Sequence, residues 1–509
     1  MKRIGIDVGG TNTDAAFVDG DRVMASVKTP TTADVTSGVK KALARLLGES
    51  SAARAAQAVI VGTTHFVNAV IERKQLERVA VIRLCLPASA SVQPLIDWPA
   101  ELRDAVRGQV ALLPGGHEID GREIAPLDES AIYATARRIA DAGISSVAIS
   151  SVFSPLRADH EERTASIVRS VLPQARLTLS KDLGRIGLLE RENVTILNSA
   201  LSSLAQRTTA AFRSAIADSG LGAQLYLTQN DGTVMSAEMA EQFPVLCFAS
   251  GPTNSMRGAA FLSGIDEAAV VDVGGTTTDI GILKNGFPRE TNTVIEIGGV
   301  RTLFRMPDVI SIALGGGTRI RTAPLRLGPD SLGFTLVEHG RVFGGNDLCT
   351  TDVAVARGLV ALGDPKRVAG LDDQLVLGVL DEARRRLEDG IDRMKTQAGD
   401  IRLIAVGGGS FLVPKMVKGV SEVVFVPHHE VANAIGAAIA QISGEVDQVF
   451  SDLSREEAIA QATALAQARA EKAGAVPDSL SVVDVEELPL TYMPGNCRRV
   501  RVRVAGKLA

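Results

Sequence analysis

Two short stretches of the chain combine carboxylates, glycines and threonines in the same order. Residues 7–14 read DVGGTNTD and residues 272–279 read DVGGTTTD, so only Asn12 and Thr277 differ. A glycine pair lets the backbone turn sharply and bring bare amide groups to a phosphate, and threonine hydroxyls add donors. A carboxylate beside such a turn can hold the water shell of Mg²⁺. Each stretch is therefore a candidate half-site for a polyphosphate, and two facing copies would grip a nucleotide across a cleft.

The site residues predicted from this repeat fall into two groups. Asp7 and Asp272 are the predicted Mg²⁺ ligands and catalytic carboxylates, and Asp14 and Asp279 either cap the turns or approach the metal. The turn residues are predicted to bind the phosphates of ATP: Gly9, Gly10, Thr11, Asn12, Thr13, Gly274, Gly275, Thr276 and Thr277. ATP and Mg²⁺ are thus the expected cofactors.

A third glycine cluster, AVGGGS at 405–410, follows an apolar run and precedes a helix-like segment. Gly407, Gly408 and Gly409 would let an adenine ring or ribose lie against the backbone. The chain has no GxxxxGK[ST] phosphate loop, and the residues after Gly10 are strand-like rather than the start of a helix. These features exclude a P-loop and a Rossmann turn.

Alternating and apolar runs predict the elements that position these residues. Each repeat is expected to form a strand, a tight turn and a second strand, followed by a turn at 19–20 or 285–286. Asn285-Gly286 is a strong hairpin turn pair because both residues tolerate positive φ. Periodicity predicts helices over 35–47, 129–142, 160–171, 188–217, 372–398 and 454–473, and buried strands over 58–61, 78–82, 146–149 and 403–406. A basic alternating run at 498–504 is expected to be an edge strand with a solvated arginine face.

The composition limits the classes of function. The 509 residues carry a formal net charge of −5 with scattered basic residues, which argues against a nucleic-acid partner. No uncharged apolar run is long enough to cross a bilayer, and no signal-peptide core follows the N-terminus. The four cysteines are far apart and form no CxxC pair. We therefore expect a cytoplasmic protein with no membrane partner and no disulfide framework.

The ordered set of motifs resembles the hydantoinase A / 5-oxoprolinase family within the actin, sugar-kinase and heat-shock ATPase superfamily. The resemblance covers most of residues 1–440. It rests on DVGGTNTDAAFVD at 7–19, VGTTHFVNAVIER at 61–73, LERENVTILN at 189–198, YLTQNDG at 226–232, ASGPTNS at 249–255, the second octapeptide, ALGGGT at 313–318, Thr351-Asp352 and AVGGGS at 405–410.

The resemblance implies an α/β protein with two duplicated actin-like ATPase (ribonuclease H-like) domains and an interdomain nucleotide cleft. Its expected segments are an N-terminal hydantoinase/oxoprolinase-like lobe at 1–185, a second lobe with the adenosine loop at 186–440, and a helix and strand extension at 441–509. The implied reaction is ATP-dependent opening of a cyclic amide or imide, such as a hydantoin or lactam, through phosphorylation of the ring carbonyl oxygen. A second, hydantoinase B-like hydrolase subunit and a homo-oligomer are the expected partners.

Several residues keep alternative interpretations. His65 is a candidate catalytic base or donor, or a hydrogen-bonded structural residue. His428 and His429 resemble a metal pair, but consecutive side chains diverge on a strand. Where the family pattern carries an Asp-x-His-like pair, this chain has Ile310 in the place of the imidazole. Two other functions use the same clamp: a small-molecule kinase, and a non-catalytic ATP-binding switch or activator subunit.

Overall fold

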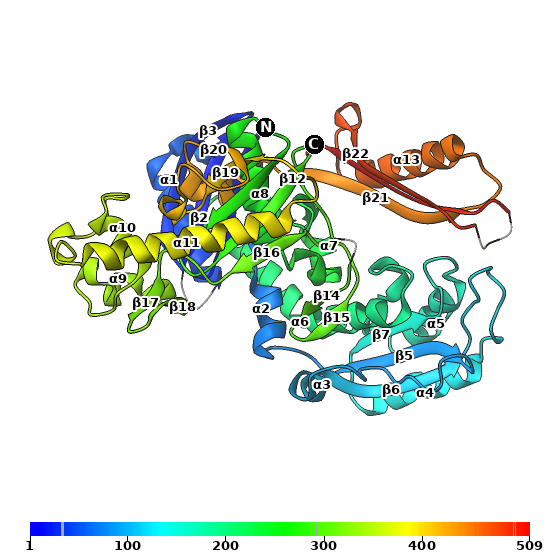
Figure 1. Ribbon diagram of the computed structural model, residues 1–509. Coiled ribbons are helices and arrows are strands. Elements are labelled where there is room, and N and C mark those ends of the chain that lie inside the picture. The colour runs from blue at the N-terminus through cyan, green and yellow to red at the C-terminus, as the bar shows by residue number, and fades with distance from the viewer. Residues whose placement is uncertain (32–34, 292, 492, 494) are drawn as a thin grey trace.

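The computed structural model describes residues 1–31, 35–291, 293–491, 493 and 495–509. The chain forms a mixed α/β fold around three larger sheets and two small hairpin sheets (Figure 1). The helices are α1 (Val35–Glu49), α2 (His65–Glu72), α3 (Ala100–Val106), α4 (Glu129–Asp141), α5 (Asp159–Val171), α6 (Leu188–Asp218), α7 (Ala237–Gln242), α8 (Ser250–Ser263), α9 (Leu336–His339), α10 (Thr350–Ala356), α11 (Asp373–Met394), α12 (Ala432–Ile439) and α13 (Arg455–Lys472).

The largest sheet has nine strands in the order β22-β23-β21-β10-β9-β4-β1-β2-β3. β1 pairs antiparallel with β2 and parallel with β4, so the first octapeptide lies near one edge of the sheet, with β3 as the strand outside it. The strands are β1 (Lys2–Val8), β2 (Asn12–Asp19), β3 (Arg22–Pro30), β4 (Ala58–Thr63), β9 (Gln224–Thr228), β10 (Thr233–Ser236), β21 (Gln441–Phe450), β22 (Ser481–Pro489) and β23 (Arg498–Gly506).

The second sheet repeats the local pattern around the second octapeptide. β11 pairs antiparallel with β12 and parallel with β19, in the strand order β13-β12-β11-β19-β20, and β16 adds to β12. Its strands are β11 (Ala268–Val273), β12 (Thr278–Lys284), β13 (Phe287–Pro288), β16 (Val309–Ile312), β19 (Ile401–Val406) and β20 (Val420–Phe425). Asn285 and Gly286 both have positive φ in the turn after β12, as the sequence predicts.

A separate unit holds a four-stranded parallel sheet in the order β6-β5-β7-β8 (lower right in Figure 1). Its strands are β5 (Val79–Leu86), β6 (Arg107–Pro114), β7 (Ser146–Ser151) and β8 (Arg176–Leu179), and α4 and α5 bury their apolar faces against it. The small hairpin sheets are β14 (Ile295–Ile297) with β15 (Val300–Thr302), and β17 (Thr318–Thr322) with β18 (Leu325–Ser331).

Predicted and observed elements agree for all six helices and all four buried strands, within a few residues at their ends. The three predicted segments do not coincide with the sheets, however. Strands β9 and β10 come from the segment predicted as a second lobe, and β21–β23 come from the predicted extension, yet all five join the sheet of the N-terminal lobe.

The prediction of an edge strand at 498–504 is wrong. β23 lies between β21 and β22, and the side chains of Arg501 and Arg503 are only 5% and 4% exposed. The arginine face is covered because carboxylates from other segments pair with it, chiefly Glu290 and Glu445. Valines on the opposite face pack against an alanine stripe of α13.

No helix in the described part of the chain is long and apolar enough to cross a membrane.

Candidate nucleotide site

The two octapeptides form hairpins with the same geometry. In the first, the amide of Gly9 donates to the carbonyl of Asn12 over 3.0 Å, and Asp7 pairs in register with Asp14. In the second, the amide of Gly274 donates to the carbonyl of Thr277 over 2.9 Å, and Asp272 pairs with Asp279. Equal spacing thus places two carboxylates side by side at the mouth of each turn.

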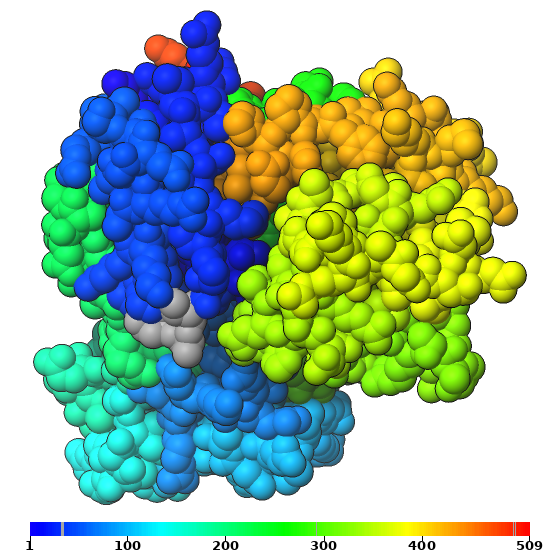
Figure 2. Space-filling view, turned by 90° about the vertical axis from the view of Figure 1, so that its left-hand side faces the viewer, coloured from blue at the N-terminus to red at the C-terminus, as the bar shows by residue number. Residues whose placement is uncertain are grey.

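Both hairpins line one cleft of about 520 Å³. The two turns lie close together: a Cβ atom built on Gly275 would be 3.0 Å from the hydroxyl oxygen of Thr11. Figure 2 shows the blue N-terminal residues and the yellow-green residues meeting along a furrow. Of the predicted site residues, the cleft is lined by Asp7, Gly9, Gly10, Thr11, Asn12, Asp14, Asp272, Gly274, Gly275, Thr276, Thr277, Asp279, Gly407, Gly408 and Gly409.

Two predicted residues lie elsewhere. Thr13 is fully buried and its hydroxyl lies 3.3 Å from that of Thr31, because neighbouring side chains of a strand point to opposite faces and Asn12 and Asp14 take the cleft side. His65 is not among the residues that line the cleft, although the neighbouring Thr64 is. Its backbone amide donates to the hydroxyl of Thr63 at the start of α2.

Asp7 is held by two asparagine amides. Asn254 on α8 donates to Oδ1 over 3.1 Å, and Asn433 on α12 donates to Oδ2 over 3.0 Å. Burial, together with the nearby charges of Asp14 and Asp272, raises the pKa of Asp7 to about 7 despite these hydrogen bonds. A cation in the cleft would relieve this cost by favouring the charged carboxylate.

Asp14 has a different environment. The ammonium group of Lys28 on β3 lies 2.7 Å from each carboxylate oxygen, and Asn433 donates to Oδ2 over 3.0 Å. One asparagine therefore bridges Asp7 and Asp14. Burial still raises the pKa of Asp14, and Lys28 opposes that shift.

In the second hairpin, serine hydroxyls take the place of these partners. Ser255 on α8 donates to Asp272 over 2.5 Å, and Ser311 on β16 donates to Asp279. Burial raises the pKa of both carboxyls, that of Asp279 to about 6. Among the described residues that line the cleft, Lys28 is the one lysine or arginine facing four aspartates. A triphosphate would add further negative charge, so the donor set fits Mg²⁺ bound together with phosphate oxygens.

Close packing of α8 against α12 places Asn254, Ser255 and Asn433 beside the hairpins. A Cβ on Gly258 of α8 would lie 1.9 Å from the carbonyl oxygen of Ala432, and one on Gly436 of α12 would lie 1.8 Å from that of Asn254. Only glycine permits this approach. Sequence reasoning missed Asn254, Ser255 and Asn433, and the ASGPTNS motif was the one signal that pointed to α8.

The AVGGGS loop supports the second hairpin from behind. The amide of Gly409 donates to the carbonyl of Val273 over 2.7 Å, and a Cβ on Gly407 would lie 2.3 Å from Oδ1 of Asp272. A Cβ on Gly408 would meet nothing, so this glycine faces open space. His429 closes the loop, with Nδ1 3.0 Å from the hydroxyl of Ser410, while its neighbour His428 adopts positive φ.

A second glycine loop, at 315–317, also contacts the hairpin. Gly316 and Gly317 donate their amides to the carbonyls of Gly274 and Gly275 over 3.0 and 2.7 Å. Thr351 in turn donates to the carbonyl of Gly316. The turn of the second hairpin is therefore fixed from both sides by backbone contacts.

Two known proteins are similar in sequence to this chain. Caprolactamase subunit alpha of Pseudomonas jessenii is 28% identical over 510 residues, covering 87% of this chain and 70% of that protein. The acetone carboxylase beta subunit of Xanthobacter autotrophicus is 24% identical over 370 residues, covering 65% of this chain and 50% of that subunit. Both relatives are, by name, subunits of larger enzymes.

The fold resembles those of two solved structures. The crystal structure of the ATP-dependent caprolactamase from P. jessenii superposes with a TM-score of 0.79 at 20% identity, covering 100% of this chain and 88% of that one. Nucleotide-free acetone carboxylase gives a TM-score of 0.69 at 18% identity, with the same coverage. Residues 3–172 match the hydantoinase/oxoprolinase N-terminal region, and residues 191–364 match the hydantoinase/oxoprolinase domain. The chain belongs to the hydantoinase/oxoprolinase family.

Proposed function

We propose that this protein hydrolyses ATP to open a cyclic amide or imide, such as a lactam or hydantoin, through phosphorylation of the ring carbonyl oxygen. The observation that carries the proposal is the pair of facing hairpins, whose turns and four aspartates line one cleft. The similarity to caprolactamase subunit alpha over 87% of the chain supports the substrate class.

We assign a role to each group of cleft residues from its position. The backbone amides of the two turns would bind phosphate oxygens, as bare amides in glycine turns do. Asp7 and Asp272, one from each hairpin, would hold Mg²⁺ through its water shell, and this ion would neutralise charge on the phosphates. Gly408, which faces open space, would lie against the nucleoside.

Asp14 and Asp279 are equivalent in sequence but not in partners. Lys28 and Asn433 bind the carboxylate of Asp14, whereas Asp279, which is partly exposed, accepts a hydrogen bond from the hydroxyl of Ser311. We therefore assign Asp14 to holding the first hairpin in place. Asp279 is the carboxylate left to face the metal or the reacting group.

The chemistry explains why ATP is needed. An amide is a poor electrophile, and transferring a phosphoryl group to its oxygen turns that oxygen into part of a good leaving group. Water then attacks the activated carbon, and the ring C–N bond breaks as the nitrogen takes up a proton, which leaves an acyl phosphate. A second water attacks the same carbon, the bond from carbon to the phosphorylated oxygen breaks, and phosphate leaves with that oxygen to give the ring-opened acid. A partner hydrolase subunit would complete this second half, and assembly into a homo-oligomer also stays a prediction.

Oxygen-18 in the ring carbonyl of the substrate tests this sequence of steps. Purified chain, alone and with a candidate partner subunit, is incubated with MgATP and a panel of labelled lactams, hydantoins and 5-oxoproline. We expect the label in inorganic phosphate and the ring-opened acid in equal amount to ADP. A stable phosphorylated product would instead indicate a kinase, and nucleotide binding without turnover of any compound would indicate a switch subunit.

Asp7→Asn tests the assignment of the metal ligand. This variant should lose Mg²⁺-dependent nucleotide binding and turnover while keeping its thermal melting temperature. Asp21→Asn is the matched control, because Asp21 is exposed in the turn after β2 and does not line the cleft. If Asp7→Asn binds MgATP like the control, the metal assignment is wrong.

A further inference from the structure

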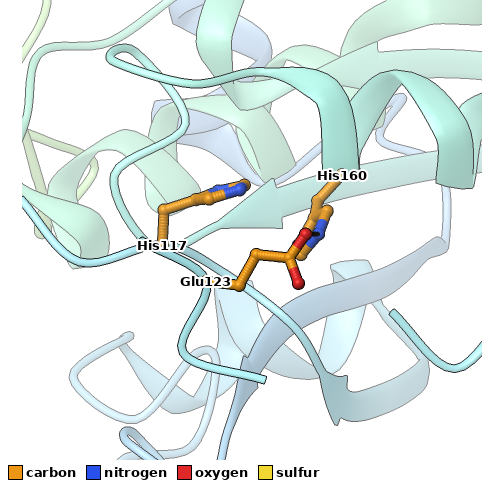
Figure 3. Close-up of side chains that lie close together, drawn as sticks. All are labelled: His117, Glu123 and His160. Carbon is orange, nitrogen blue, oxygen red and sulfur yellow. Dashed lines mark ion pairs between the residues drawn. The ribbon is translucent and has the colours of Figure 1, made fainter. Parts of the chain in front are cut away.

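Two histidines and a glutamate converge at one end of the four-stranded unit (Figure 3), and none of them lines the nucleotide cleft. His117 and Glu123 lie in the segment between β6 and α4, and His160 lies in the first turn of α5. One donor atom from each residue lies within 4.8 Å of the other two. Nε2 of His160 is 3.4 Å from Oε1 of Glu123, and the centroids of the two imidazole rings are 4.3 Å apart.

His117 is the unusual member of this cluster. Its side chain is fully buried, yet within the described structure neither ring nitrogen makes a hydrogen bond. Nε2 lies 3.3 Å from Oδ1 of Asp159, without hydrogen-bond geometry. A buried polar group without a partner costs free energy, so natural structures rarely keep one without a reason. The contact of His160 with Glu123 gives His117 no partner.

We propose that His117, His160 and Glu123 bind one divalent cation of the zinc class. Two imidazoles and a carboxylate are a ligand set that zinc accepts, with a fourth position left to water. Tetrahedral ligands at about 2.0–2.1 Å from zinc stand roughly 3.4 Å apart, which is the separation already present between His160 and Glu123. Asp159 stands beside His117 as the outer carboxylate that metal-bound histidines commonly have.

One hydrogen bond sets a condition on metal binding. The amide of Gly116 donates to Nδ1 of His160 over 3.0 Å, which places the ring proton on Nε2, the nitrogen that faces Glu123. To bind a cation, Nε2 must lose this proton and Nδ1 must carry one. Rotation of the peptide between Gly115 and Gly116 would offer Nδ1 a carbonyl acceptor in place of the amide. Both residues are glycines with positive φ, at +136° and +91°, where such a change is least hindered.

The bound cation would join the segment at 115–123 to the start of α5. Both lie at the carboxyl ends of β6 and β7, so the ion would fix this end of the unit. The side chains of Glu123 and Asp159 are each 46% exposed, which gives the ion a route from solvent. The site involves none of the cleft residues and does not depend on the proposed reaction.

Zinc retention by the full-length chain tests the proposal. Metal-free protein is loaded with Zn²⁺ in excess Mg²⁺, which occupies the cleft carboxylates, and is then gel-filtered and analysed by mass spectrometry for metal. We expect one zinc per chain in the parent protein, and loss of that zinc in His117→Gln and in Glu123→Gln. His339→Gln is the matched control, because His339 is exposed and distant in the fold.

Two further readouts keep the test decisive. Glu123→Gln changes a half-exposed side chain, so it should fold like the parent, which circular dichroism checks. Substituted Co²⁺ should give the visible spectrum of a nitrogen-containing tetrahedral site in the parent and in His339→Gln, and not in the two site variants. Failure of the parent to retain zinc, or equal retention by parent and both site variants, would overturn the proposal.

Discussion

Replacing Asn433 by leucine removes the amide that bridges the two carboxylates of the first hairpin. Its Nδ2 lies 3.0 Å from Oδ2 of both Asp7 and Asp14, so one substitution takes a donor from each. Leucine keeps the number and branching of the side-chain heavy atoms of asparagine. The expected defect is therefore electrostatic, and its size follows from the pKa of Asp7.

In the parent protein, burial and neighbouring charge raise the pKa of Asp7 to about 7. In the proposed site Mg²⁺ would bind the charged carboxylate, so the proton would have to leave first. Linkage then weakens apparent Mg²⁺-nucleotide binding by a factor of about 2 at pH 7 and about 11 at pH 6. A hydrogen bond to a charged group is worth about 1.5–3 kcal/mol. At 1.36 kcal/mol per pKa unit, its loss would move the pKa of Asp7 to about 8–9 and weaken binding at pH 7 roughly 5- to 50-fold.

Titration calorimetry with Mg²⁺ and a non-hydrolysable ATP analogue, from pH 6 to 9 in buffers of different ionisation enthalpy, measures both affinity and proton release. The parent should gain about fivefold in affinity from pH 6 to 7 and release about half a proton at pH 7. Asn433→Leu should keep gaining up to pH 9, where it approaches the parent. Asn346→Leu, at an exposed position, should behave like the parent. A deficit of Asn433→Leu that is the same at every pH would refute the electrostatic reasoning.

Three further substitutions test how the site is built. Gly275→Val would place its Cβ 3.0 Å from the hydroxyl oxygen of Thr11. This steric overlap should cost about 1–3 kcal/mol and weaken nucleotide binding about tenfold, which calorimetry measures. Gly436→Ala would drive a methyl group into the backbone of α8, so we expect a lower melting temperature by calorimetric scanning. Arg503→Met should lower the free energy of unfolding, measured in urea, by about 3 kcal/mol. This is the low end of the cost of breaking a buried ion pair, because Asp231 keeps Arg305 as a second partner.

Each of these has an outcome that would count against it. Gly10→Ala meets no atom within 4 Å, so it should bind nucleotide better than Gly275→Val, and equal binding would show that the turns do not approach. An unchanged melting temperature for Gly436→Ala would mean that the two helices separate without cost. Urea unfolding of Arg503→Met at the parent midpoint would show that the buried arginine contributes nothing to stability.

Local features of the fold were predictable, because hairpins and amphipathic helices are encoded by neighbouring residues. The DVGGT turns fix their own register, and the AVGGGS loop follows its strand directly. Asn433 was not predictable, because it is 426 residues away from Asp7 and its role depends on the close packing of α12 on α8. Alternation at 498–504 correctly indicated one polar face, but it carries no information on whether water or distant carboxylates would cover that face.

The two hairpins show that near-identical sequence does not impose identical chemistry. In the first, Lys28 and Asn433 neutralise and hold Asp14, and these partners come from β3 and α12 rather than from the repeat itself. In the second, a hydroxyl of β16 is the partner of Asp279, and burial raises the pKa of that carboxyl to about 6. A carboxylate already paired with a cation stabilises the fold but has little left to offer a ligand, whereas one without such a partner gains most from a bound metal. In the proposed reaction, the first hairpin would therefore be better suited to anchoring the phosphates, and the second to meeting the charge that changes.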